Sequence, residues 1–231
     1  MYAPRPAPGA EIVFGGDDIY EDFSSAALGL RNIATTAGFA ARVRMGTAAF
    51  ALPRTQQPAL VILYRATGTF HPAEQQALAD LVASGTGLLA IHSSAFYNLE
   101  DGKVSERDRI VRDLIGCHFV DHGPRPHDST FTVEIMPGHE LTDGIEPFTI
   151  EHEHYRTATV DDITVHVRRR TAEGGYEPIL YSRRHGAGRV AYLQLGHHGG
   201  VWAVPGVRDL LVRTMTWLAS PAVEHAADRS A

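Results

Sequence analysis

Two short, uninterrupted apolar runs place the strongest constraint on how this chain folds. One is Leu60–Leu63, within the segment Ala59–Tyr64, and the other is Leu88–Ile91. Runs of this length without polar alternation are typical of parallel strands covered on both faces, where neither face meets water. Together with the apolar run Glu11–Phe14, they predict the centre of a parallel sheet.

Segments with helical periodicity alternate with these strands. One helix is expected from Ser24 to Gly38, a second from Pro72 to Gly85, and a third over residues 106–115. Helices between buried strands indicate a sheet with helices on its faces. The remaining expected elements are strands at Ala41–Arg44, Thr130–Ile135, Ile163–Arg168, Pro178–Tyr181 and Arg189–Leu195, and a helix at Val207–Leu218. Because several later strands alternate, we predict a three-layer α/β fold, with a mainly parallel (flavodoxin-like) central sheet and added antiparallel strands.

Length and charge exclude several classes of protein. With 231 residues, we expect one domain over residues 11–220, a flexible lead-in at 1–10 and a tail at 221–231. The formal net charge is −6, and no basic face indicates a nucleic-acid partner. No apolar run reaches the roughly 18 residues of a membrane span. The one cysteine, Cys117, cannot form an internal disulfide, which favours the cytoplasm.

Histidines stand at the predicted ends of two strands. His92 directly follows Leu88–Ile91, and His197 follows the strand that ends at Leu195. In open α/β sheets, ligands bind beyond the carboxyl ends of the strands. Each of these histidines is therefore either an acid/base group or ligand, or a side chain held by backbone hydrogen bonds.

The segment 151–155 alternates carboxylates with imidazoles. If it is extended, Glu153 and Tyr155 face one way together with Glu151, which suits proton transfer. The imidazoles of His152 and His154 then face the other way, which suits a metal ion. A solvent-exposed polar strand is the alternative. The sequence has no HExxH motif and no paired CxxC, so a structural zinc site is not expected, whereas a metal held by histidines from separate loops stays open.

Several segments together carry a resemblance to a known family. In chain order they are Gly85–His92, Gly116–His122, Glu153 with Tyr155, Gly186–Tyr192, and Gly196-His197 with Trp202. In this order they resemble trehalose-utilisation (ThuA-like) proteins over residues 10–220. That family is similar in fold to class I glutamine amidotransferases and is linked to sugar catabolism, including oxidised (keto) disaccharides. The resemblance therefore implies a small carbohydrate as the ligand.

The sequence lacks the catalytic cysteine and the carboxylate of the class I amidotransferases at the corresponding positions. Those enzymes place a nucleophilic cysteine on a sharp turn after the central strand, where this sequence has His92. Their later His-x-Glu pair corresponds to His197 followed by Gly199, so the carboxylate is missing. An imidazole does not replace a thiolate in forming a thioester. Cys117 follows a predicted helix and not a strand, so we expect it to be a small buried residue. Glutaminase chemistry is therefore not expected.

Two functions are compatible with these residues. The first is an enzyme, an isomerase, lyase or hydrolase, that acts on a sugar or keto-sugar by acid/base chemistry, with or without a metal. The second is a non-catalytic sugar-binding or regulatory module that uses the same site. Convergence of the histidines with Glu153 in one pocket would favour the enzyme.

Roles follow for individual residues under the first function. His92, Glu153 and His197 are the predicted catalytic groups. His122, Tyr155 and Trp202 are the predicted substrate-binding groups. A divalent metal, if one binds, is expected within the same histidine cluster. The apolar segment Val201–Val207 is a candidate surface for a homo-oligomer.

Overall fold

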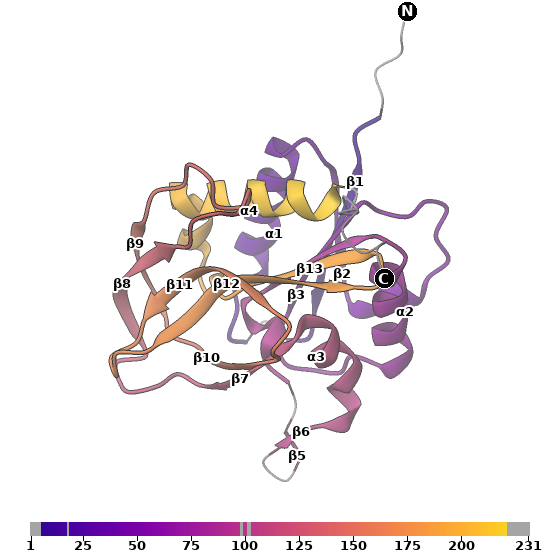
Figure 1. Ribbon diagram of the computed structural model, residues 1–231. Coiled ribbons are helices and arrows are strands. Elements are labelled where there is room, and N and C mark those ends of the chain that lie inside the picture. Colours follow the sequence, from indigo (N-terminus) through magenta and orange to yellow (C-terminus); the bar gives the residue numbers. More distant parts are fainter. Residues whose placement is uncertain (1–5, 18, 98, 101–102, 221–231) are drawn as a thin grey trace, which may run out of the picture.

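The structure is a computed structural model that describes residues 6–17, 19–97, 99–100 and 103–220 (Figure 1). Strand β1 begins at Gly9, and Ala10 is buried within it, so the sheet takes in two residues that were expected in the lead-in. Residues 1–5 and 221–231, also expected as lead-in and tail, lie outside the described residues. Within the described ranges, no helix is long and apolar enough to cross a membrane.

A nine-stranded sheet organises the molecule, in the order β2-β1-β3-β4-β13-β12-β11-β8-β9. Its first half is parallel and contains β1 (Gly9–Gly15), β2 (Ala40–Met45), β3 (Leu60–Arg65), β4 (Gly87–Ile91) and β13 (Gly188–Leu193). Its second half is antiparallel and contains β8 (Asp128–Ile135), β9 (Phe148–Glu153), β11 (Thr164–Arg170) and β12 (Tyr176–His185). Every residue of β3 and β4 is buried, which explains the uninterrupted apolar runs Leu60–Leu63 and Leu88–Ile91 within them. The predicted α/β fold with added antiparallel strands is confirmed.

Helices cover both faces of the parallel half. The α-helices are α1 (Phe23–Thr36), α2 (Pro72–Ala83), α3 (Arg109–Ile115) and α4 (Pro205–Ala219) (Figure 1). On one face, Leu30 of α1 and Leu210 of α4 belong to the same core as Ile62. On the other face, Leu78 of α2 shares a second core with Val61. Consecutive residues of β3 thus point into opposite cores, as the pleat of a strand requires.

Two helix starts differ from the sequence expectation. The α1 helix is capped by Asp22, whose carboxylate accepts a hydrogen bond from the Ser25 amide at 2.9 Å, so Ser24 is not the cap. The third expected helix begins as a 3₁₀ turn, η3 (Glu106–Asp108), before α3. Further 3₁₀ turns are η1 (Thr47–Ala51), η2 (His92–Ala95) and η4 (Gly199–Ala203).

Two small strand pairs lie outside the main sheet. The antiparallel pair β7 (Cys117–Asp121) and β10 (Arg156–Thr159) was not expected from the sequence. The other pair is β5 (Leu99–Glu100) with β6 (Lys103–Val104). The β7 strand carries Phe119 and leads into His122, and both residues line the cavity described below.

Candidate active site

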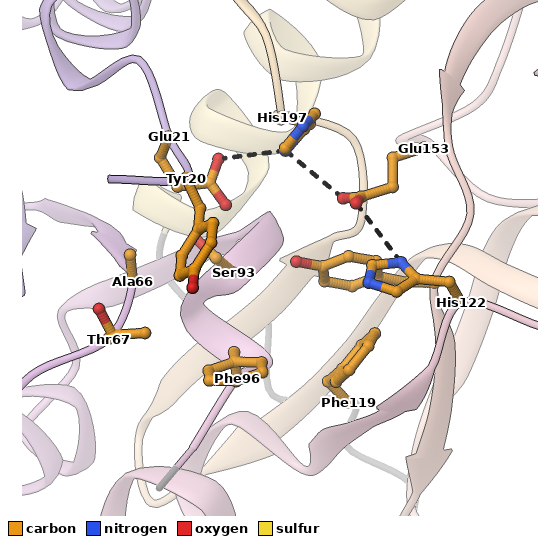
Figure 2. A pocket seen from close by; sticks show the side chains of 11 residues that line it. Tyr20, Glu21, Ala66, Thr67, Ser93, Phe96, Phe119, His122, Glu153 and His197 are labelled. Atoms are coloured by element: carbon orange, nitrogen blue, oxygen red, sulfur yellow. Dashed lines mark ion pairs between the residues drawn. The ribbon is translucent and has the colours of Figure 1, made fainter. Parts of the chain in front are cut away.

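Four loops meet at the carboxyl edge of the parallel strands. Glu21 comes after β1, Thr67 after β3, His92 after β4 and His197 after β13. A cavity of about 290 Å³ opens at this edge (Figure 2). It is lined by Tyr20, Glu21, Ala66, Thr67, Ser93, Phe96, Phe119, His122, Glu153, Tyr155 and His197. The cavity lies where ligands bind in open α/β sheets.

His92 adopts a backbone conformation that is unfavourable for its residue type. Its φ is 45°, and it is the only non-glycine residue with positive φ in the described part of the chain. The ring is fixed nonetheless: Nδ1 donates to the Gln194 carbonyl at 2.6 Å, and the ring stacks on Tyr155 with centroids 4.3 Å apart. The Tyr192 hydroxyl also donates to the His92 carbonyl at 2.9 Å. Backbone strain from a positive φ at a non-glycine residue is found most often at functional sites.

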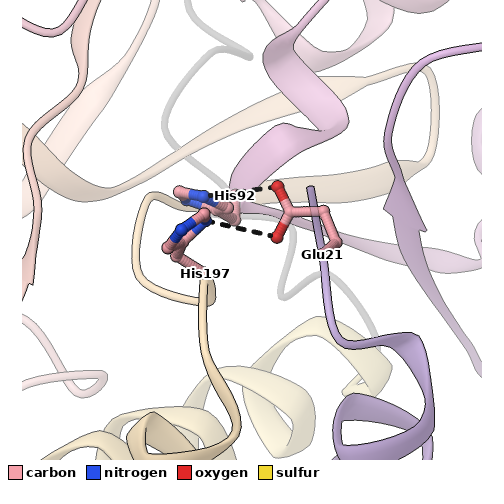
Figure 3. Close-up of side chains that lie close together, drawn as sticks. All are labelled: Glu21, His92 and His197. Atoms are coloured by element: carbon pink, nitrogen blue, oxygen red, sulfur yellow. Dashed lines mark ion pairs between the residues drawn. The ribbon is translucent and has the colours of Figure 1, made fainter. Parts of the chain in front are cut away.

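The other ring nitrogen of His92 faces two carboxylates. Nε2 lies 3.3 Å from Glu153 Oε2 and 3.6 Å from Glu21 Oε1. His197 repeats this arrangement, because its Nδ1 lies 3.4 Å from Glu153 Oε2 and 3.6 Å from Glu21 Oε2 (Figures 2 and 3). The two nitrogens and Glu153 Oε2 are buried, and no hydrogen bond from the described residues satisfies them. Such a concentration of unsatisfied buried atoms is rare in native structures.

Glu153 is the carboxylate that faces both the histidines and the cavity. Burial raises its pKa, but the nearby His92, His197 and His122 outweigh burial and hold the pKa below its usual value. Its Oε1 lies 3.4 Å from His122 Nδ1, which also donates to the His154 carbonyl at 2.9 Å. Glu153 is therefore ionised near neutral pH.

The carboxylate of Glu21 was missed by the sequence analysis. It is buried, and the Tyr64 hydroxyl donates to its Oε2 at 2.6 Å. Burial and the adjacent Glu21 raise the pKa of Tyr64, so the phenol stays protonated and orients the carboxylate. In turn, the close approach of Glu21 raises the pKa of His197, with Glu153 acting in the same direction and burial opposing them. A single acidic residue in a loop gives no periodic sequence pattern. Its position after the first predicted strand could nevertheless have indicated that Glu21 is a candidate site residue.

The trehalose-utilisation (ThuA) family model matches residues 12–218. The chain belongs to the ThuA family. This confirms the resemblance seen in the sequence, and membership indicates a role in trehalose or carbohydrate utilisation. No curated protein matches the sequence.

Solved structures share the fold of this ThuA protein. A ThuA-like protein from Parabacteroides merdae ATCC 43184 has a TM-score of 0.75 at 13% identity, covering 93% of this chain and 90% of that chain. A ThuA-like protein from Bacteroides uniformis ATCC 8492 has a TM-score of 0.73 at 18% identity, covering 94% of each chain. A GMP synthase protein from Thermoplasma acidophilum has a TM-score of 0.56 at 12% identity, covering 92% of this chain and 94% of that chain. At these identities, the likeness shows the fold alone.

The predicted site residues of the ThuA protein do not all reach the cavity. Glu153, His197, Tyr155 and His122 line it, whereas His92 is fully buried behind them. Trp202 does not line the cavity. It is buried in the core, with its ring centroid 6.4 Å from that of Tyr64.

Trp202 is held in the core by close packing. A Cβ atom at Gly29 would lie 2.6 Å from the indole, so α1 approaches the ring directly. Trp202 is thus a packing residue of the core in this structure and lies outside the cavity in which a substrate-binding role was expected. Val201 and Val207 are buried too, so much of the apolar surface expected for self-association lies inside the protein.

The expected face of paired imidazoles does not form. His152 Nε2 accepts hydrogen bonds from the amides of Gly196 at 2.9 Å and His197 at 3.2 Å, while its Nδ1 donates to the Glu153 carbonyl at 2.8 Å. Burial and the neighbouring His92 lower the pKa of His152 well below its usual value, so the ring is neutral. The ring of His154 lies elsewhere, with Nε2 2.6 Å from the Ser129 hydroxyl. His152 and His154 therefore do not form a metal site together.

Two further residues that the sequence offered as candidates lie outside the site. Glu151 is exposed on β9 and does not line the cavity. Cys117 is buried on β7, also outside the cavity, and burial raises the pKa of its thiol to about 12. A thiol that remains protonated and enclosed in this way is not a nucleophile.

Proposed function

We propose that this ThuA protein is an enzyme that moves a proton next to the carbonyl group of a sugar or keto-sugar, with Glu153 as the proton-transfer group. The observation that carries this proposal is the position of Glu153. It is an ionised carboxylate at the cavity wall, with the imidazoles of the buried His92 and the half-buried His197 beside it.

The chemistry needs a base and a positively charged or polar group for the developing oxyanion. A carbonyl group acidifies the neighbouring C–H bond, so a carboxylate can take the proton while the electron pair moves into an enolate. Return of the proton to the other carbon gives isomerisation, and loss of a leaving group gives elimination. The imidazoles of His92 and His197, 3.3 Å and 3.4 Å from Glu153 Oε2, are the groups that we expect to stabilise the oxyanion.

The geometry favours Glu153 over His92 as the group that touches the substrate. His92 has no exposed surface and does not line the cavity, whereas Glu153 does. His92 then acts through its neighbours, either as a positioning residue or as one of the groups that stabilise the oxyanion. Under this proposal His92, which was predicted as a catalytic group, does not touch the substrate.

The cavity wall offers groups that suit a carbohydrate. Phe96, Phe119 and Tyr155 present aromatic rings, against which the C–H faces of a sugar ring pack. The hydroxyls of Thr67 and Ser93 are buried at the wall and find no hydrogen-bond partner in the described part of the protein. They are available for sugar hydroxyls, which donate and accept hydrogen bonds.

A kinetic comparison of Glu153→Gln with Glu151→Gln tests the proposal. Keto-disaccharides are screened for turnover by the wild-type protein, and the saturated rate and dissociation constant are then measured for each variant. We expect Glu153→Gln to lower the saturated rate by roughly 10²–10⁴ with little change in binding. Glu151→Gln, on the same strand but exposed, should behave as wild type. An unchanged saturated rate with weaker binding in Glu153→Gln would instead indicate a sugar-binding module.

A further inference from the structure

We propose that Glu21, His92 and His197 form a binding site for a divalent transition-metal ion of the zinc type, with Glu153 beside the metal but outside the ligand set. The existence of the site stands on geometry alone. Its catalytic consequence rests on the proposed function, because the metal would be the group that stabilises the oxyanion.

The three side chains already surround one point. One ligand atom from each lies within 4.8 Å of the other two, and the nearest carboxylate oxygens of Glu21 are 3.6 Å from His92 Nε2 and from His197 Nδ1 (Figure 3). Ligand atoms at about 2.0–2.1 Å from a tetrahedral zinc ion are separated from one another by about 3.3–3.4 Å. These two contacts involve different oxygens of Glu21. With one carboxylate oxygen as the ligand, all separations lie within 4.8 Å and need to close by at most about 1.4 Å.

Ion pairing alone does not account for this geometry. Charge-assisted N–H···O hydrogen bonds are about 2.7–2.9 Å long, but the shortest contact between these imidazoles and either carboxylate is 3.3 Å. His92 Nε2 and His197 Nδ1 are buried and make no hydrogen bond within the part of the chain that the structure describes. Two buried lone pairs or N–H groups without partners cost free energy unless a ligand satisfies both.

The surroundings fix the ligand atoms as a metal site requires. Histidines that bind metals usually donate their second N–H to a carbonyl or carboxylate. His92 does this through Nδ1 to the Gln194 carbonyl at 2.6 Å, which leaves Nε2 as the ligand. The Tyr64 hydroxyl similarly holds Glu21 through Oε2. By contrast, His152 is not a candidate ligand, because its Nε2 already accepts two backbone hydrogen bonds.

The donor set selects the class of metal. Two imidazoles and one carboxylate suit zinc and similar transition metals, whereas calcium and magnesium prefer oxygen ligands. Three protein ligands leave a coordination position free, and Glu21 and His197 both line the cavity from which a ligand would reach it. A sugar carbonyl oxygen bound there would carry the negative charge of the enolate, while the proton of the neighbouring C–H bond passes to Glu153. No oxidation or reduction is involved.

Metal titration of the chelator-stripped, full-length protein tests the site. Calorimetry with Zn²⁺ and absorption spectroscopy with Co²⁺ should show one ion per chain, with the Co²⁺ spectrum of a four- or five-coordinate site. We expect Glu21→Gln and His197→Ala to weaken Zn²⁺ binding at least 100-fold. Glu153→Gln should change it less than 10-fold, and Glu151→Gln should leave it unchanged. His197→Ala serves as the second ligand variant because His197 is only half-buried, and circular dichroism confirms that each variant is folded.

The possible results separate the site from the proposed function. Absence of stoichiometric Zn²⁺ and Co²⁺ binding by the wild type, or wild-type affinity in Glu21→Gln, would overturn the site. A loss in Glu153→Gln as large as that in Glu21→Gln would overturn the assignment of Glu153 outside the ligand set. Keto-sugar turnover that persists in metal-free protein would overturn the catalytic role of the metal but leave the proposed function intact. Stoichiometric metal binding without any keto-sugar turnover would confirm the site and count against the proposed function.

Discussion

At the scale of single residues, His92 shows how the site is held against the preference of the backbone. A left-handed conformation costs an L-residue roughly 1–2 kcal/mol because Cβ approaches the neighbouring carbonyl oxygen. At φ 45°, His92 bears this cost, and the hydrogen bonds through Gln194 and Tyr192 keep it in place. The turn after β4 thus fixes the His92 side chain at the sheet edge. Class I glutamine amidotransferases place the thiol of their nucleophilic cysteine after the corresponding strand.

The strain predicts an unusual order of stability for two variants. His92→Gly and His92→Ala both remove the imidazole, but only alanine keeps the Cβ atom that is unfavourable at positive φ. His92→Gly should therefore be the more stable by about 1 kcal/mol, the reverse of the order within a helix or strand. Urea unfolding of the two variants measures the difference. Greater stability of His92→Ala would show that the backbone here is not strained.

At the scale of elements, the loop between β13 and η4 depends on β9. His152 at the end of β9 accepts hydrogen bonds from the backbone amides of Gly196 and His197, and so sets where His197 lies. The following residue of β9 is Glu153. One strand end therefore positions both the carboxylate and the loop that faces it.

Removal of that anchor should destabilise the protein and disturb the site together. His152→Ala leaves two buried amides without an acceptor, so we expect the free energy of unfolding to fall by about 2–4 kcal/mol. His154→Ala removes a ring whose Nε2 lies 2.6 Å from the partly buried Ser129 hydroxyl and which packs edge-on against Phe131, and it should cost less than half as much. Chemical denaturation of both variants checks this. Equal losses would mean that the loop is held by other contacts.

The parallel strands could be predicted from the sequence, but the approach of β9 to them could not. Apolar runs identify β3 and β4 because burial on both faces leaves no polar position. The positions of His92 and His197 at the carboxyl edge follow directly. The expected alternation of residues 151–155 fails because β9 ends at Glu153, so His152 and Glu153 both reach the site. Glu21 and the burial of Trp202 depend on tertiary packing, which no local pattern encodes.

At the scale of the whole molecule, the site takes residues from both halves of the sheet. The parallel half supplies Glu21, His92 and His197, and the antiparallel half supplies Glu153. The antiparallel half also contains His166 on β11, a buried histidine whose Nε2 is 2.7 Å from the Ser182 hydroxyl. Its titration lies outside the site and bears on the stability of the protein.

The buried His166 predicts a loss of stability in mild acid. Burial, together with the adjacent His139, lowers its pKa from 6.5 to about 4. Between these values the unfolded chain binds the proton more readily, so the stabilisation present above pH 6.5 is lost as the pH falls toward 4. Between pH 7 and 4.5, the wild type should lose about 2 kcal/mol more than His166→Gln. Urea unfolding across this range measures the difference, and parallel pH profiles would contradict the assignment.

The most direct test of proton transfer by Glu153 follows a single hydrogen atom of the substrate. A keto-disaccharide is incubated with the protein in D₂O, and ¹H NMR records the loss of the C–H signal next to the carbonyl group. If Glu153 transfers that proton, the wild type and Glu151→Gln exchange it for deuterium, and Glu153→Gln does so roughly 10²–10⁴ times more slowly. Exchange at equal rates in the wild type and Glu153→Gln, or no exchange in the wild type for any keto-sugar that it binds, would contradict the account.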